Sequence, residues 1–220
     1  GMALIPGGNF LMGAGTPMPA GGDTPASAVP LVVSAGTPAE VDTFCMDVTE
    51  VTVDAYAQCS VCTEPGTVRY LHGCNWAKPG RGNHPVNCVD WEQAASYCRA
   101  IGKALPTEAQ WEFAARGGSK QLEFPWGPEE PGSRACWNGA GNDLGEGNRL
   151  GTCPVGSFAA GAYGLRDMAG NVSEWVQDRY ADYYPERVAK GYSGPPVGSS
   201  RVFRGGSWGE NHPSAFRGGH

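Results

Sequence analysis

The segment Gly164–Trp175, which reads GLRDMAGNVSEW, holds two carboxylates, Asp167 and Glu174, on either side of a tight turn. Gly170 and Asn171 lie between them, and both residue types tolerate positive φ, so the chain can fold back here. Folding back would bring the two carboxylates and the intervening carbonyls to one point. Such a set of oxygen ligands suits Ca²⁺ better than Zn²⁺ or Cu⁺. The same spacing also fits a turn whose acids only cap backbone N–H groups, and both interpretations stay open at this point.

Seven further motifs follow one another along nearly the whole chain. They are IPGG at 5–8 with Met12 and Gly13, VTEVT at 48–52, HPVNCVDW at 84–91, LPTEAQWEFAARGG at 105–118, FPWG at 124–127, PVGS at 154–157 and RGGSW at 204–208. Each motif alone is weak, but seven in this order are highly specific. Together with 164–175 they resemble the formylglycine-generating-enzyme (sulfatase-modifying-factor) superfamily.

The resemblance implies an α+β fold of the formylglycine-generating-enzyme type, related to the C-type lectin fold and poor in regular secondary structure. We expect residues 2–220 to form one domain, with Gly1 a remnant of an expression tag. Family members usually continue to a closing strand with a Gly-Phe-Arg pattern, and this sequence reaches His220 without it. Family membership alone does not imply an activity.

The composition excludes several classes of function. The formal net charge is −6 and no basic run occurs, which argues against nucleic acid and anionic membrane surfaces as partners. No apolar run approaches the ~20 residues that a membrane span needs. The chain has 34 Gly and 18 Pro, yet 7 Trp, 8 Tyr and 7 Phe exclude a disordered chain, so a packed, loop-rich domain is expected.

Eight cysteines favour an oxidising compartment, so we expect an extracytoplasmic protein, whether periplasmic, secreted or surface-anchored. Cys136 and Cys153 flank a Gly-rich loop and are predicted to form a disulfide. The other six are predicted to pair among themselves at least in part: Cys45, Cys59, Cys62, Cys74, Cys88 and Cys98. The C-x-x-C at 59–62 could instead contribute to a zinc site, but no second C-x-x-C occurs at zinc-ribbon spacing, so disulfides are favoured.

Two capping boxes predict helices. Asp90 with Gln93 opens a helix that Gly102 ends, and Thr107 with Gln110 opens one that runs through Arg116. A short helix capped by Thr52 or Asp54 should run through Cys59, and Trp111, Ala114 and Ala115 should face the core. Strands are expected at 5–12, 41–46, 155–158, 175–178 and 202–205.

Carried over residue by residue, the resemblance implies a calcium site at the 164–175 turn. Asp167 and Glu174 match side-chain ligand positions, and Gly170 and Val172 match backbone-carbonyl positions.

A second calcium site of the family would lie in the loop from Cys136 to Leu150. Its usual Asn ligand position falls on Cys136, which is a poor Ca²⁺ ligand. Asp143 and Glu146 are the acids that could substitute there.

The RGGSW segment decides the expected chemistry. In enzymes that make formylglycine, two cysteines follow this motif, bind Cu⁺ and carry the redox reaction. The matching positions here are Glu210 and Ala215, and no cysteine follows Cys153. Because Cu⁺ needs soft thiolates, no copper is expected and formylglycine generation is not expected. Ser207 is retained, but it has no base beside it in the sequence.

Two hypotheses therefore remain. The first is a non-catalytic module whose cleft at Ser207, Trp208 and Glu210 binds a small molecule, glycan or peptide. Four tyrosines in the loop 180–196 either join that surface or pack on the core. The second is an oxidoreductase of the superfamily, through formylglycine generation or non-haem-iron chemistry, although the four scattered histidines give no support to a facial triad. Metal analysis would separate the two, since calcium alone favours the module.

Overall fold

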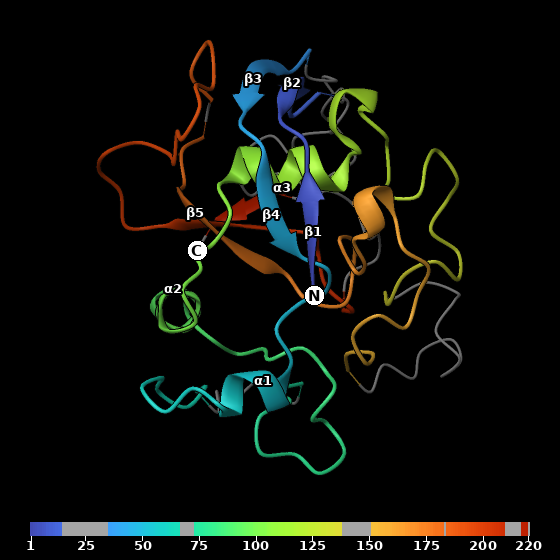
Figure 1. Ribbon diagram of the computed structural model, residues 1–220, viewed down its shortest axis with the longest axis vertical. Helices are drawn as coiled ribbons and strands as arrows, with labels where there is room; N and C mark the ends of the chain where they lie inside the picture. The colour runs from blue at the N-terminus through green and yellow to red at the C-terminus, as the bar shows by residue number, and fades with distance from the viewer. Residues whose placement is uncertain (15–34, 67–72, 138–150, 183, 210–216, 220) are drawn as a thin grey trace, which may run out of the picture.

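The structure is a computed structural model that describes residues 1–14, 35–66, 73–137, 151–182, 184–209 and 217–219 (Figure 1). Its helices are α1 (Val53–Ala57), α2 (Trp91–Ala100) and α3 (Glu108–Ala115), with 3₁₀ turns η1 (Gly118–Lys120) and η2 (Ala162–Gly164). The rest of the described chain is strands and long irregular connections. The expected α+β fold with little regular structure is confirmed.

The strands of the described residues pair antiparallel in three small sheets. One sheet pairs β1 (Met2–Ile5) with β4 (Phe44–Asp47), and a second pairs β2 (Gly8–Met12) with β3 (Thr37–Val41). The third has the order β5 (Glu174–Arg179), β6 (Arg201–Arg204), β7 (Arg217–Gly219). In Figure 1, β1 and β4 lie in front, α3 and the β5–β6 pair lie behind them, and α2 lies to one side.

Each of the three helices begins after the capping residue that the sequence predicts. Thr52 caps α1, and complete capping boxes formed by Asp90 with Gln93 and by Thr107 with Gln110 open α2 and α3. Gly102 follows the end of α2 with φ of 73°, a conformation that glycine adopts without strain.

Two strand predictions were wrong because the chain turns where one strand was expected. The segment 5–12 is split between two sheets at Pro6 and Gly7, where a Cβ atom on Gly7 would come within 2.5 Å of the Val41 carbonyl oxygen. The segment 41–46 is likewise split, since β3 ends at Val41 and β4 begins at Phe44. Both splits depend on contacts between segments far apart in the sequence.

The strand expected at 155–158 is also absent, since this described segment is irregular. Val155 donates one backbone hydrogen bond to the Asn83 carbonyl (2.9 Å), with no ladder beyond it. The expected strands at 175–178 and 202–205 correspond to β5 and β6.

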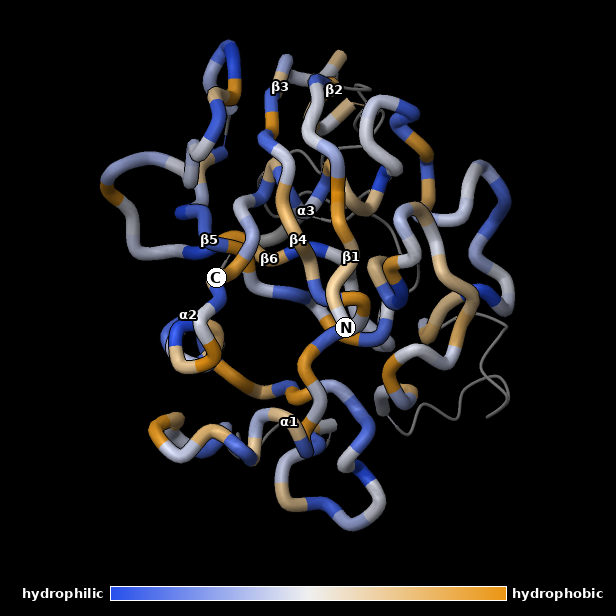
Figure 2. The backbone as a smooth tube through the Cα atoms, viewed as in Figure 1, coloured by the Kyte–Doolittle hydropathy of each residue, from blue (hydrophilic) through white to orange (hydrophobic). Residues whose placement is uncertain are grey.

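The hydrophobic core lies where α3 packs against the sheets. Figure 2 shows apolar stretches along β1 and β4, in front of α3. As predicted, Trp111, Ala114 and Ala115 are buried. Three tyrosines of the 180–196 loop pack on the core, namely Tyr180, Tyr184 and Tyr192, whereas Tyr183 lies outside the described residues.

Charged side chains of α3 are buried in this core as an ion network. Glu112 is 1% exposed and pairs with Arg116 (3.0 Å) and with Arg204 of β6. It also accepts a hydrogen bond from the backbone N–H of Gly13 at the end of β2 (2.7 Å). Glu108 accepts a hydrogen bond from the Tyr184 hydroxyl (2.7 Å). The network therefore joins α3 to β2, β6 and the tyrosine loop.

Three disulfides staple the described chain. The predicted Cys136–Cys153 bond is confirmed. Of the other six cysteines, four form Cys59–Cys62 and Cys74–Cys88, so the C-x-x-C does not hold zinc in this structure. Cys45 and Cys98 are free thiols.

Replacing Glu112 by Gln should lower the free energy of unfolding by about 3–5 kcal/mol, because two buried guanidinium groups lose their carboxylate partner. Denaturant unfolding followed by circular dichroism measures the loss. The matched control is Asp47→Asn, which removes the half-exposed Asp47–Lys103 pair and should cost about 1 kcal/mol or less. Equal losses in the two variants would contradict a structural role for the buried network.

Removing the Cys136–Cys153 bond with a double serine variant should cost about 3 kcal/mol, because the crosslink closes a 17-residue separation. The Cys59–Cys62 bond links cysteines with a sequence separation of only 3, so the double serine variant at these positions should cost about 1.6 kcal/mol. Melting curves of the two variants, recorded without reductant, test the order. A larger loss of stability from removing Cys59–Cys62 than from removing Cys136–Cys153 would show that the length of the closed loop does not determine how much each disulfide stabilises the fold.

Candidate functional site

The 164–175 segment folds back as the sequence predicts. Gly170 has φ of 84° and Asn171 has φ of 59°, so both occupy the left-handed region. Asp167 also lies there with φ of 59°, which sequence reasoning missed. Left-handed backbone at a residue other than glycine is uncommon and needs support from its surroundings.

Asn171 is held in its left-handed conformation by three hydrogen bonds of its own. Its N–H donates to the Cys136 carbonyl (2.8 Å), its side-chain oxygen accepts from the N–H of Cys153 (2.9 Å), and its carbonyl accepts from the N–H of Trp208 (2.9 Å). The N–H of Gly170 donates to the Gly205 carbonyl (2.9 Å). The turn is thereby attached both to a disulfide and to the RGGSW segment.

Each of the two predicted carboxylates accepts a hydrogen bond from a distant segment of the chain. Asp167 accepts from the N–H of Gly156 (2.6 Å), and Glu174 accepts from the indole N–H of Trp111 on α3 (3.1 Å). A third carboxylate, that of Glu50, interacts electrostatically with both. Its two oxygens are buried, and the side chain of Asn171 lies close enough to Glu50 to offset part of the rise in its pKa.

Burial disfavours the charged form of all three carboxylates, and for Glu50 and Glu174 the charge of a neighbouring carboxylate adds to this effect. Burial, followed by the charges of Asp167 and Glu174, raises the pKa of Glu50 well above its ordinary value. Burial also raises the pKa of Asp167, and it raises the pKa of Glu174 to about 7. A bound cation would favour the charged forms and remove this penalty.

The residues present fit a hard cation. The candidate donors are all oxygens, those of the Asp167 and Glu174 carboxylates and of the Gly170 and Val172 backbone carbonyls. Across the described ranges, no three His, Cys, Asp or Glu side chains converge as a ready-made metal site. A cation would therefore depend on the two backbone carbonyls as well as on Asp167 and Glu174, as expected for Ca²⁺.

The second calcium site cannot be placed, because Asp143 and Glu146 lie outside the described residues. Cys136 is bonded to Cys153 and so offers no thiolate to a metal.

The predicted cleft is described only in part. The N–H of Trp208 is bonded to the turn as above, and a Cβ atom on Gly73 would come within 2.9 Å of its indole ring, so ring and backbone are in close contact. Ser207 is partly buried, and Glu210 lies outside the described residues. Whether Ser207, Trp208 and Glu210 bind a ligand stays a prediction.

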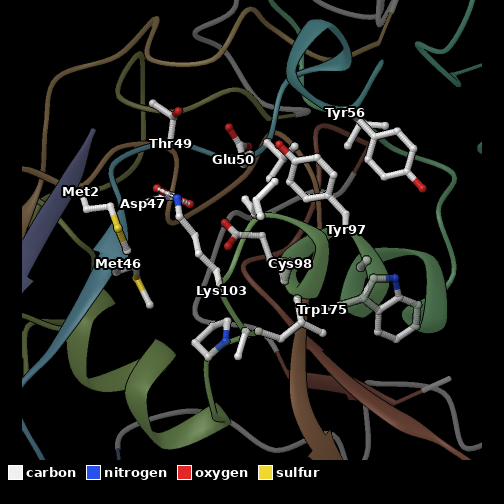
Figure 3. A pocket seen from close by; sticks show the side chains of 18 of the residues that line it. Met2, Met46, Asp47, Thr49, Glu50, Tyr56, Tyr97, Cys98, Lys103 and Trp175 are labelled. Carbon is white, nitrogen blue, oxygen red and sulfur yellow. Dashed lines mark hydrogen bonds and ion pairs between the residues drawn. The ribbon is translucent and has the colours of Figure 1, made fainter. Parts of the chain in front are cut away.

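A groove of about 610 Å³ lies elsewhere, between β4, α2 and the 164–175 turn (Figure 3). Most of its walls are apolar. Lys103 reaches Asp47 across it in an ion pair of 2.6 Å, and Glu50 lies among its lining side chains. Sequence reasoning missed the groove because its walls come from segments far apart in the sequence, and the family motifs among them do not show that folding brings them together.

Comparison with known proteins gives one consistent result. Residues 1–220 match the family described as the sulfatase-modifying factor enzyme 1-like domain. The chain is 35% identical to the formylglycine-generating enzyme of Streptomyces coelicolor over 94% of this chain and 78% of that protein. It is also 39% identical to the inactive C-alpha-formylglycine-generating enzyme 2 of Bos taurus, over 60% of this chain and 42% of that protein.

The solved structure of PvdO from Pseudomonas aeruginosa has a similar fold. Its TM-score is 0.72 at 26% identity, covering 100% of this chain and 87% of that one. The chain spans less than half the length of several curated relatives, including the Thermomonospora curvata (46%) and Mus musculus (41%) formylglycine-generating enzymes.

A calcium chelator should lower the melting temperature of the protein. Calcium at about 100 times its dissociation constant would add about 2.7 kcal/mol to the free energy of unfolding. Asp167→Asn should abolish the sensitivity to chelation, because it removes one of two charged ligands. Differential scanning calorimetry with calcium and with chelator measures both effects.

The control is Asp182→Asn, which changes an exposed acid away from the turn and should leave the sensitivity intact. If chelation leaves the wild-type melting curve unchanged and titration calorimetry detects no calcium binding, the turn is only a hydrogen-bonded loop.

Proposed function

The chain belongs to the sulfatase-modifying factor enzyme 1-like family, and we propose that it is a non-catalytic, calcium-stabilised member that acts as a binding module outside the cytoplasm. The proposal concerns three separate properties: catalysis, location and ligand.

The observation that supports a non-catalytic role is the placement of the thiols. All eight cysteines lie within the described residues, and six of them are in disulfides. The two free thiols, Cys45 and Cys98, lie on β4 and α2, where they line the groove. No cysteine follows the RGGSW segment, and Glu210 and Ala215 offer no thiolate to Cu⁺. The similarity to a relative that is named as an inactive formylglycine-generating enzyme is consistent with such a member.

The disulfides support an extracytoplasmic location. Three disulfides in one domain are compatible with an oxidising compartment. None of the described helices has the length and hydrophobicity needed to cross a bilayer.

The ligand surface of the proposal is the segment that carries Ser207, Trp208 and Glu210. Its floor is held in place because Arg204 is anchored in the buried network, while Gly205 and Trp208 are bonded to the turn. A carboxylate at Glu210 would give a cationic or hydroxyl-rich ligand a charge-assisted hydrogen bond. A small molecule, a glycan or a peptide could each supply such groups.

The protein should not convert the cysteine of a sulfatase-type peptide to formylglycine, and adding Cu⁺ should not change this. Mass spectrometry of the peptide, incubated with and without copper, measures the conversion. The Streptomyces coelicolor formylglycine-generating enzyme, run in parallel, is the positive control. Turnover by this protein in either tube would show that other residues carry the oxidation and that the binding-module proposal is wrong.

A further inference from the structure

We propose that the Cys59–Cys62 bond is an exchangeable disulfide that thiol reductants open, and that its reduction releases the segment 63–64 from the start of α2. This disulfide hairpin follows α1, which lies below α2 in Figure 1. The hairpin belongs neither to the 164–175 turn nor to the surface at Ser207 and Trp208, so the exchange is independent of the function proposed above.

Opening this disulfide leaves the rest of the fold crosslinked. The bond joins cysteines with a sequence separation of 3, against 14 for Cys74–Cys88 and 17 for Cys136–Cys153. A crosslink contributes less to the stability of a fold when the loop that it closes is shorter. The domain therefore loses least when Cys59–Cys62 opens, and a reduced form that stays folded is what reversible exchange requires.

The Cys59–Cys62 hairpin is accessible to an attacking thiol. Val61, between the two cysteines, is 78% exposed, and both cysteines are themselves partly exposed. In contrast, each of the other two disulfides has one buried cysteine, Cys74 at 7% and Cys136 at 2% exposure. Exposed disulfides are the labile ones in proteins, because a thiolate must reach a sulfur atom to open the bond.

The exchange is a balanced two-electron reaction. The thiolate of a reductant attacks one sulfur of the bond, which forms a mixed disulfide and expels the other cysteine as a thiolate. A second thiolate of the reductant then attacks the mixed disulfide and expels the remaining cysteine. The two cysteine thiolates take up the two protons that the reductant thiols lost. The protein disulfide is thereby reduced to two thiols, and the reductant, either a dithiol or two monothiols, is oxidised to a disulfide.

The closed hairpin holds the segment 63–64 against the start of α2. The Tyr56 hydroxyl donates to the Thr63 carbonyl (2.9 Å). The side-chain nitrogen of Gln93 donates to Thr63 Oγ1 (3.2 Å) and to the Glu64 carbonyl (2.8 Å). Because the segment follows the disulfide directly, these hydrogen bonds depend on where the chain leaves the hairpin.

Gln93 connects this contact to the helix itself. Its side-chain oxygen accepts from the N–H of Asp90 (2.9 Å) in the capping box of α2, while its nitrogen donates to the segment 63–64. Tyr56 is 2% exposed and stacks on Tyr97 of α2 with ring centroids 5.2 Å apart. Once the hairpin opens, the chain after it is no longer held in position. We therefore expect reduction to loosen the first turn of α2.

The first test is a redox titration of the whole native protein in buffers of reduced and oxidised glutathione. After an acid quench, free thiols are alkylated with N-ethylmaleimide and located by peptide mass spectrometry. We expect Cys59 and Cys62 to become alkylated at a reduced-glutathione concentration at least tenfold lower than the other four bonded cysteines require. A glutathione adduct on either residue marks the mixed disulfide. Reduction of the three disulfides together, or of Cys59–Cys62 last, would overturn the proposal.

Hydrogen exchange measures what reduction releases. In protein reduced only at Cys59–Cys62, the amides of residues 59–66 and of the first turn of α2 should exchange at least tenfold faster than in the oxidised protein. The amides of α3 should exchange at the same rate in both forms. Unchanged exchange in residues 59–66 would contradict the release.

A matched variant separates the two roles of Gln93. Gln93→Glu keeps an oxygen for the N–H of Asp90 but removes the donor to the segment 63–64. The oxidised variant should already exchange rapidly in residues 63–66, and reduction should add less than twofold there. A further tenfold increase on reduction would contradict the assignment of Gln93 as the residue that holds the segment.

The free thiols Cys45 and Cys98 provide the control for indirect exchange. The double variant Cys45→Ser, Cys98→Ser should be reduced at Cys59–Cys62 as readily as the wild type. If this variant folds but loses the selective reduction, exchange begins at the free thiols and the proposal is wrong. If the variant does not fold, the titration of the wild type still decides the proposal.

Discussion

The Glu112 carboxylate holds together parts of the chain that are far apart in the sequence. It contacts the Gly13 N–H after β2, Arg116 in its own helix and Arg204 on β6. With so little regular secondary structure, few backbone ladders are available to position these parts. Buried charge pairs require their partners, because a carboxylate or guanidinium left alone in the core is strongly destabilising. The network therefore restricts how α3 and the β5–β6 sheet can pack.

The buried ion network around Glu112 and the carboxylate cluster formed by Glu50, Asp167 and Glu174 differ in charge balance. In the network, two carboxylates, Glu108 and Glu112, are matched by two guanidinium groups, Arg116 and Arg204. In the cluster, the buried Glu50 interacts with two further carboxylates, Asp167 and Glu174, and with the side chain of Asn171. Helix α3 contributes to both, because its Trp111 donates a hydrogen bond to Glu174 and its Glu112 pairs with Arg204. An added cation would therefore be stabilising at the carboxylate cluster and not at the ion network, whose charges are already paired.

Sequence reasoning succeeded where the signal was local and failed where it was not. The capping residues Asp90 and Thr107 opened helices where predicted, and Gly170 with Asn171 made the predicted turn. The divisions between β1 and β2 and between β3 and β4 were missed, because each depends on which distant strand is the partner. Glu50 was missed for a similar reason: the VTEVT motif that contains it indicated only the family resemblance, and only folding brings it to the turn. The cleft at Glu210 and the second metal loop stay predictions, since both involve residues outside the described ranges.

The three hydrogen bonds of Asn171 have a thermodynamic consequence for the disulfide beside it. One asparagine joins the turn that presents Asp167 and Glu174 to both halves of the Cys136–Cys153 bond. Two equilibria that share one rigid element are coupled, and the coupling is the same in both directions. A ligand that orders the turn would therefore make the disulfide harder to reduce. Conversely, reducing conditions would weaken the hold of the turn on its ligand, so the domain would retain that ligand best in an oxidising environment.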